Sequence, residues 1–184
     1  MNEGQGASAD LRERGLTREL IHAGHLRLHL DTVMLPNGRM ATREVIEHPG
    51  AVAIVALPDD RHVLMVRQYR HAISELTWEL PGGGLEPRDA SPLAAAQREL
   101  AEETGHTADH WHLVGCFHAS AGYTTELTHL FEARGLRPVP TTRPEDEFVD
   151  LHAINHRDAL DWIAQGVIRD AKSIIGLLRC PPTP

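Results

Sequence analysis

The sequence is poor in the residues that mark several specialised classes of protein. Only two of its 184 residues are cysteines, Cys116 and Cys180, and they lie far apart in no metal-ligand pattern. A disulfide scaffold is therefore excluded, and a reduced, cytoplasmic location is expected. No apolar run approaches the roughly 18 residues that a membrane-spanning helix needs. The polar N-terminus also lacks the apolar core of a secretory signal.

Positive charge is also scarce. The 18 Lys and Arg residues stand against 26 Asp and Glu residues, which gives a formal net charge of −8. Because no basic patch stands out, nucleic acid is not an expected partner. The length suits one domain with a proper core, and 41% hydrophobic residues are ordinary for a soluble globular protein. A polyphosphate substrate would need metal ions to approach so acidic a chain.

The chain does contain a stretch, residues 79–105, that joins a predicted strand end through a glycine-rich loop to a short acidic helix. Ser91 is a favourable N-cap, Pro92 suits the first helical position, and Gly105 is a typical C-terminal stop. At roughly 100° per residue, one stripe of this helix is apolar and is expected to face the core: Leu93, Ala96 and Leu100. The neighbouring stripe carries Glu99, Glu102 and Glu103.

The acidic stripe is locally unfavourable. Glu99 and Glu103 are like charges four residues apart, which costs about 0.2–0.5 kcal/mol. Glu102 and Glu103 lie in the last turn, where the helix dipole disfavours an anion by roughly 0.3–1 kcal/mol. Three converging carboxylates are hard oxygen ligands suited to Mg²⁺ or Mn²⁺. The alternative is a solvated face, since Glu is a good helix former.

The helix resembles the second half of the Nudix box, G-x5-E-x7-R-E-U-x-E-E-x-G-U (U is bulky and apolar), over Arg98-Glu99-Leu100-Ala101-Glu102-Glu103-Thr104-Gly105. The first half departs from the pattern, and two alignments stay open. Counting back from Arg98 places Gly84 on the first glycine and Ala90 on the first glutamate. Alternatively, Gly83 is that glycine and Asp89 replaces the glutamate, with one extra residue before Arg98. In the family that glutamate mainly braces the helix arginine, so Arg98 is expected to lack its usual partner.

The resemblance extends over residues 18–179 and is closest to the ADP-ribose pyrophosphatase branch of the Nudix hydrolases. The matching segments are 47–52, 66–70, 78–83, 145–147 and 170–172. It implies an α/β fold, a Nudix-type α/β/α sandwich with a mixed sheet and an N-terminal antiparallel β-subdomain. The implied parts are a flexible N-terminus at 1–17, a β-subdomain at 18–47 that is exchanged across a homodimer, and a catalytic core at 48–184.

Periodicity in the rest of the chain independently indicates a mixed α/β sandwich. Residues 19–33 alternate with the period of a strand, a turn signal follows at 36–38, and residues 40–46 form the return strand of a predicted hairpin. A continuous apolar run at 51–57 predicts a buried strand. Two further helices are expected near the C-terminus, at 156–165 and 169–179.

The resemblance implies metal ligands at particular positions. Glu99 and Glu103 are expected to bind the ion directly, Glu102 to bind it or to hold a water molecule, and the carbonyl of Gly82 to serve as a backbone ligand. Glu126 lies in a loop that matches a family loop with a catalytic glutamate, so it is nominated as general base. The alternative for Glu126 is a surface residue at a strand start. In some family members the base lies in the helix, which would make it Glu102.

Substrate-binding residues are expected before the glycine-rich loop. Arg67 and Arg70 could grip a phosphate bidentately. The alternative is that one of them only pairs with a surface carboxylate, and Arg70 is the better candidate for that role. Glu79 is expected to hold a substrate hydroxyl or a water molecule. The implied reaction is Mg²⁺-dependent hydrolysis of ADP-ribose to AMP and ribose 5-phosphate. Alternatives are another nucleotide sugar or a dinucleotide as substrate, and a non-catalytic Nudix module that senses a nucleotide.

Overall fold

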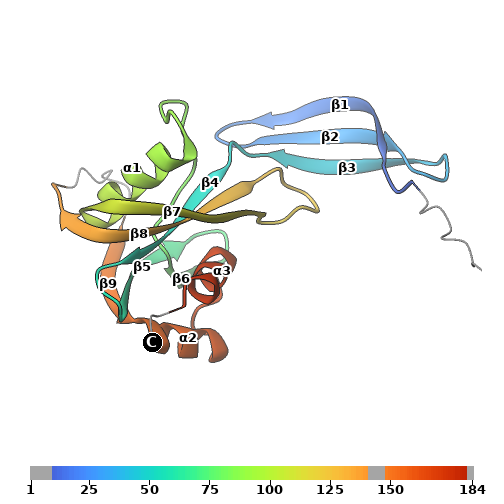
Figure 1. Ribbon diagram of the computed structural model, residues 1–184. Coiled ribbons are helices and arrows are strands. Elements are labelled where there is room, and N and C mark those ends of the chain that lie inside the picture. Colours follow the sequence, from blue (N-terminus) through green and yellow to red (C-terminus); the bar gives the residue numbers. More distant parts are fainter. Residues whose placement is uncertain (1–9, 141–147, 182–184) are drawn as a thin grey trace, which may run out of the picture. The chain divides into compact units, whose positions relative to one another are not determined.

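The computed structural model describes residues 10–140 and 148–181 and has an α/β architecture (Figure 1). The chain divides into two compact units, residues up to 48 with 120–125, and residues 49–119 with those from 126 onward. The segment 145–147 and the first nine residues of the expected N-terminus lie outside the described residues. Within the described ranges, no helix is long and apolar enough to cross a membrane.

The smaller unit contains one antiparallel sheet, with strands β1 (Arg14–Ala23), β2 (Arg27–Met34) and β3 (Met40–Glu47) in that order. The predicted turn at 36–38 joins β2 to β3. The prediction of one strand over 19–33 is wrong, because a turn in which the Gly24 N–H donates to the Leu26 carbonyl divides it into β1 and β2. The start of β1 also lies within the segment that was expected to be flexible.

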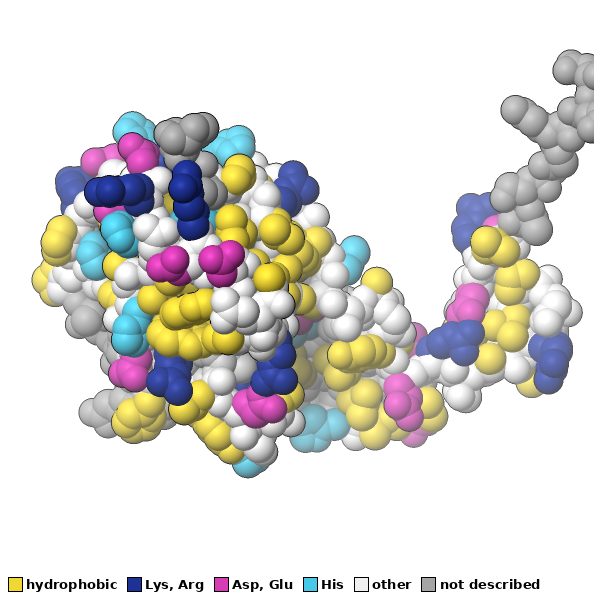
Figure 2. Space-filling view, turned by 90° about the horizontal axis from the view of Figure 1, so that it is seen from below, with side chains coloured by type: hydrophobic (Ala, Val, Ile, Leu, Met, Phe, Trp, Pro, Cys, Tyr) yellow, Lys and Arg dark blue, Asp and Glu magenta, His cyan; other side chains and the backbone are white. Residues whose placement is uncertain are grey.

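This sheet buries few of its own side chains. Within β1, β2 and β3, only His29 and Val33 are buried. Figure 2 shows hydrophobic side chains on the face of this unit that is turned to the viewer, on the right. The large exposed hydrophobic residues of these strands are Leu16, Leu20, Ile21 and Met40. Such a surface is unusual for a sheet that stands alone, since three strands need a packed apolar face for stability.

The larger unit holds two further three-stranded sheets. The first is mixed, because its central strand is parallel to one neighbour and antiparallel to the other: β4 (Ala51–Leu57), β8 (Leu127–Pro138) and β7 (His106–His118). The second is antiparallel and has the order β6 (Glu75–Glu79), β5 (His62–Arg70) and β9 (Val149–Asn155). The mixed sheet that the family resemblance implied is confirmed.

Strand β4 separates two hydrophobic cores. All seven of its residues are buried, and successive side chains point to opposite faces of a strand. Ala53, Val55 and Leu57 therefore pack on one side, in the core that α2 (His156–Ala164) and α3 (Ala171–Arg179) complete. The alternate residues pack with α1 (Pro92–Thr104) on the other side. Helices thus cover both faces (Figure 1), which confirms the α/β/α sandwich.

Helix α1 begins and ends where the sequence predicts. The Ser91 side chain accepts the Ala94 N–H at 3.1 Å, and Gly105 adopts a left-handed conformation with φ of 66°. Its buried face differs from the prediction, because Leu93 is 37% exposed. The buried residues are Ala95, Ala96, Glu99, Leu100, Glu103 and Thr104. The buried face of α1 is therefore rotated from the predicted apolar stripe toward the glutamates, so the carboxylates of Glu99 and Glu103 are buried.

Candidate active site

The glycine-rich loop after β6 is held against β4. The Ile54 N–H donates to the Pro81 carbonyl at 2.8 Å, and the Val52 N–H donates to the Gly83 carbonyl at 2.9 Å. A Cβ on Gly82 would overlap the Val52 carbonyl oxygen. The backbone therefore approaches β4 more closely than a side chain at that position allows.

Two glutamates of α1 lie directly against this loop. Glu99 is 8% exposed and Glu103 is 4% exposed. A carboxylate oxygen of Glu103 accepts the Gly82 N–H at 2.8 Å, and a Cβ on Gly83 would overlap the Glu99 carboxylate. Since residues four apart lie on one side of a helix, both carboxylates converge on the same two glycines. The structure thus brings two of the expected metal ligands, Glu99 and Glu103, to the backbone at Gly82, which carries the third.

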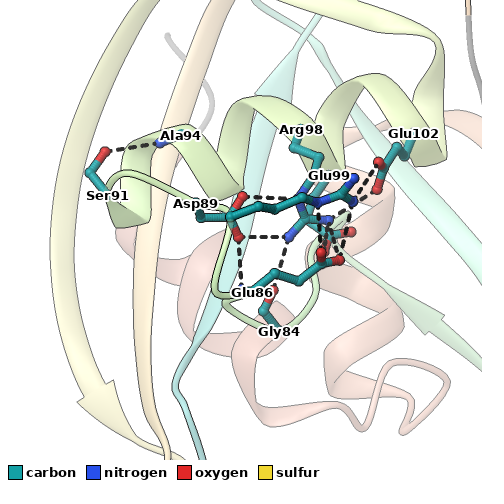
Figure 3. Close-up of polar contacts among 9 residues, drawn as sticks. Gly84, Glu86, Asp89, Ser91, Ala94, Arg98, Glu99 and Glu102 are labelled. Carbon is teal, nitrogen blue, oxygen red and sulfur yellow. Dashed lines mark hydrogen bonds and ion pairs between the residues drawn. The ribbon is translucent and has the colours of Figure 1, made fainter.

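The side chain of Arg98, on α1, reaches the loop that precedes the helix (Figure 3). Its Nε and Nη2 donate to the two carboxylate oxygens of Asp89 at 3.1 and 3.0 Å, and Nη2 also donates to the Gly84 carbonyl at 3.0 Å. These hydrogen bonds hold the pKa of Asp89 below its usual value. The expectation that Arg98 lacks its partner is wrong, because Asp89 braces it. This contact agrees with the second alignment, in which Asp89 replaces the glutamate with one extra residue before Arg98.

The same guanidinium reaches the helix glutamates. Its Nη1 donates to Glu99 at 2.8 Å and to Glu102 at 3.0 Å. Among the described residues, no three His, Cys, Asp or Glu side chains are already arranged as a metal site. The positive charge of Arg98 lies between two of the expected ligands, Glu99 and Glu102. The donor set itself, carboxylates beside a backbone carbonyl, fits the hard cations Mg²⁺ and Mn²⁺.

A second cluster surrounds Glu79, whose side chain is 2% exposed. It accepts hydrogen bonds from Arg70 at 2.6 and 2.7 Å, from the Thr77 hydroxyl at 2.6 Å and from Lys172 at 2.5 Å. Burial alone raises the pKa of Glu79, but the hydrogen bonds from Arg70 and the charge of Lys172 outweigh it and lower the pKa to about 2. Arg70, Glu79 and Lys172 also line a pocket of about 510 Å³.

The structure does not bring every expected site residue together. Arg67 and Arg70 are three residues apart on β5, so their side chains leave opposite faces of the strand. The guanidinium of Arg67 lies over the Trp78 ring, 5.7 Å from its centroid. Glu126 stands just before β8, where its carboxylate accepts a hydrogen bond from the Thr128 hydroxyl at 3.2 Å.

Three residues at the start of α3 that were not predicted as site residues also belong to the cluster around Glu79: Asp170, Lys172 and Ser173. Asp170 is the N-cap of α3 and accepts both the N–H and the hydroxyl of Ser173. An Asp immediately before an apolar helix is a recognisable capping signal. The sequence pattern could not reveal that this turn contacts Glu79 through Lys172, because the two residues are 93 positions apart.

The NUDIX domain family profile matches residues 47–174, which include both clusters. The chain belongs to the Nudix family. It is 37% identical over 168 residues to a methanol dehydrogenase activator of Bacillus methanolicus, with 90% of each chain covered. It is also 37% identical over 166 residues to an ADP-ribose pyrophosphatase of Bacillus subtilis, with 89% of each covered. A crystal structure of an ADP compounds hydrolase shares the fold, with a TM-score of 0.79, 20% identity and 91% coverage of each chain.

The protein is therefore a Nudix hydrolase similar to the ADP-ribose pyrophosphatases, as the sequence predicted. Its helix carries the intact glutamates of the Nudix box, and the altered first half of the box still supplies a carboxylate to the helix arginine. The two relatives bear different names at the same identity. Relatedness alone thus assigns the enzyme class and leaves the substrate to the chemistry of the site.

The brace on Arg98 is open to a direct test in this Nudix hydrolase. We expect Asp89→Ala to lower the free energy of unfolding by about 1–3 kcal/mol, because a nearly buried, charge-assisted pair is lost. Urea denaturation measures this. Asp109→Ala, which removes an exposed partner of Arg137, is the matched control and should cost less than about 1 kcal/mol. Equal losses in the two variants would contradict the brace.

The Glu79 cluster predicts a dependence of stability on pH. Because the pKa of Glu79 falls from 4.5 to about 2 on folding, its ionised form stabilises the fold above pH 4.5, by on the order of 3 kcal/mol. This stabilisation is lost as the pH falls toward 2. Glu79→Gln should therefore be less stable than wild type at pH 7, and the difference should narrow between pH 4.5 and 2 in denaturant titrations.

A neighbouring residue on the same strand supplies the control for this experiment. Glu75 pairs with Arg169 at the surface, and its side chain is 45% exposed. Glu75→Gln should change stability little at any pH, since exposed ion pairs contribute at most about 1 kcal/mol. A difference between Glu79→Gln and wild type that stays constant over this pH range would show that the ionisation of Glu79 is not the cause.

Proposed function

We propose that this Nudix hydrolase cleaves the diphosphate linkage of a nucleoside diphosphate derivative, with ADP-ribose as the preferred substrate and AMP and ribose 5-phosphate as products. The observation that carries the proposal is the convergence of the Glu99 and Glu103 carboxylates on the Gly82–Gly83 backbone. Support for ADP-ribose comes from the Bacillus subtilis relative, which is named for that activity.

In this proposal, Glu99, Glu103 and the Gly82 carbonyl hold Mg²⁺, or Mn²⁺ in its place, and Glu102 adds a ligand or holds a water molecule. When bound, a divalent cation lowers the pKa of water and neutralises charge on phosphate oxygens. Burial of Glu99 and Glu103 supports their role, because the surrounding protein keeps their oxygens in one orientation. Glu102 is more accessible, with 18% of its side chain exposed.

Glu126 is our candidate for the general base that takes the proton of the attacking water. The hydrogen bond from the Thr128 hydroxyl gives its carboxylate a fixed orientation at the start of β8. Glu102 is the second candidate. Its carboxylate carries ion pairs to both Arg98 and Arg88.

We assign the substrate contacts to the Glu79 cluster and to Arg67. The Arg70 side chain is 43% exposed and donates two hydrogen bonds to Glu79, so Glu79 can orient the guanidinium toward a phosphate. A water molecule or substrate hydroxyl could meet Glu79 through the same pocket. Arg67 is exposed over Trp78, and it would act on a substrate group that lies at the other face of β5.

We further propose that the protein is a homodimer joined through β1–β3 and that it works in the cytoplasm. The exposed apolar side chains of that sheet support a second copy, since a sheet of three strands needs a packed hydrophobic face for stability. The free thiols of Cys116 and Cys180 support a reducing compartment. Light scattering on the purified chain should give the mass of a dimer. The mass of a monomer would contradict the proposed homodimer.

The substrate proposal is tested with a panel of ADP-ribose, several nucleotide sugars, a dinucleoside polyphosphate and NADH, each with Mg²⁺. We expect AMP to be released fastest from ADP-ribose, as read by chromatography. Glu103→Gln should lower kcat/KM on the order of 10²-fold or more, equal to about 2.7 kcal/mol of barrier. Asp161→Asn, which neutralises an exposed carboxylate of α2, should leave the rate unchanged.

The outcomes separate the parts of the proposal. Faster cleavage of another compound would replace ADP-ribose as substrate and retain the metal site. Binding of a nucleotide without cleavage of any compound would identify a sensor instead of an enzyme. Glu126→Gln and Glu102→Gln in the same assay decide the base, because the base variant loses activity while its Mn²⁺ affinity stays at the wild-type value.

A further inference from the structure

Helix α3 reaches the glycine-rich loop through one buried hydrogen bond. The Leu80 N–H donates to the Ser173 hydroxyl oxygen at 2.7 Å. Leu80 is 1% exposed and Ser173 is fully buried. Leu80 is the first residue after β6, where the strand no longer supplies backbone partners. The hydroxyl of α3 therefore takes the place of a strand partner, two residues before Gly82.

The Ser173 hydroxyl is itself held in one orientation. Its proton is donated to Asp170 Oδ2 at 2.5 Å, and the same carboxylate oxygen accepts the Ser173 N–H at 2.9 Å. A lone pair of the hydroxyl is therefore left to face Leu80. Lys172 links this turn to Glu79, the residue that precedes Leu80, because its ammonium group contacts both Asp170 and Glu79.

The remaining polar groups around the Gly82 carbonyl are also engaged. Glu103 of α1 accepts the Gly82 N–H, and β4 donates to the carbonyls of Pro81 and Gly83. Three elements thus fix the backbone on either side of this carbonyl: α1, β4 and, through Leu80, α3. A ligand oxygen must be held within about 0.5 Å of its productive position, so the loss of one of these restraints should loosen the site.

From this geometry we infer that Ser173, held by Asp170, is a positioning residue that sets the Gly82 carbonyl for cation binding. The inference rests on the proposed function, in which that carbonyl is a ligand. In this inference Ser173 is not itself a ligand and acts through the Leu80–Gly82 backbone. Partners of this outer kind typically change metal affinity by about 10–100-fold when they are removed.

The test is Mn²⁺ binding by the full chain, followed by electron paramagnetic resonance of the free ion and thus independent of turnover. We expect Ser173→Ala to raise the Mn²⁺ dissociation constant about 10-fold and to lower kcat more than it raises KM. Asn155→Ala is the matched control, because it removes the N-cap bond of α2 to the Arg157 N–H without contact to the loop. Both variants are compared at a temperature at which circular dichroism shows them folded.

The results distinguish this inference from the proposed function. An Mn²⁺ affinity of Ser173→Ala equal to that of Asn155→Ala overturns the inference, whatever the wild type cleaves. A wild type that binds Mn²⁺ tightly and cleaves nothing in the panel overturns the proposed function, while weaker binding by Ser173→Ala still supports the positioning role. A wild type without Mn²⁺ affinity overturns both.

A second variant keeps the test valid if Ser173→Ala does not fold. Asp170→Asn retains an oxygen that can cap the Ser173 N–H but removes the charge that holds the Ser173 hydroxyl and Lys172. We expect an intermediate loss of Mn²⁺ affinity, about threefold, since the outer restraint is weakened and not removed. An affinity equal to that of wild type would overturn the inference.

Discussion

The burial of two like charges against a backbone is the constraint on which this structure depends. Glu99 and Glu103 lie one helical turn apart and are 8% and 4% exposed. An unpaired buried carboxylate would be strongly destabilising, so each one needs a donor. The Gly82 N–H serves Glu103 and the Arg98 guanidinium serves Glu99. Only a loop of glycines can approach the helix closely enough, because a Cβ on Gly83 would overlap the Glu99 carboxylate.

The loop connects the two cores of the larger unit. Strand β4 sends alternate side chains to α1 and to α3, while its own backbone N–H groups bind the loop carbonyls of Pro81 and Gly83. Glu103 and Ser173 then meet the loop from the two helices. The position of the Gly82 carbonyl therefore depends on the packing of both layers, and a change in either core can reach the site.

The two ionic clusters differ in their balance of charge, and this difference separates their roles. Around Glu79, the cations Arg70 and Lys172 meet the anions Glu79 and Asp170, so the cluster is neutral. Around Arg98, the guanidinium groups of Arg88 and Arg98 face a larger number of carboxylates: Glu86, Asp89, Glu99 and Glu102. Glu103 lies one turn after Glu99 on α1. The excess of negative charge favours a divalent cation at the cluster around Arg98. The neutral cluster is complete without one.

The sequence by itself determined the elements whose causes are local. Ser91 and Gly105 bound α1 by capping, the i, i+4 spacing puts Glu99 beside Glu103, and the apolar run of β4 requires burial on both faces. Only the tertiary structure decided the remaining questions, since they depend on residues that are distant in the chain. Asp89 replaced the missing brace of Arg98, because the loop turns back onto the helix. Ser173 met Leu80 across 93 residues, a contact that leaves no trace in local propensity or spacing.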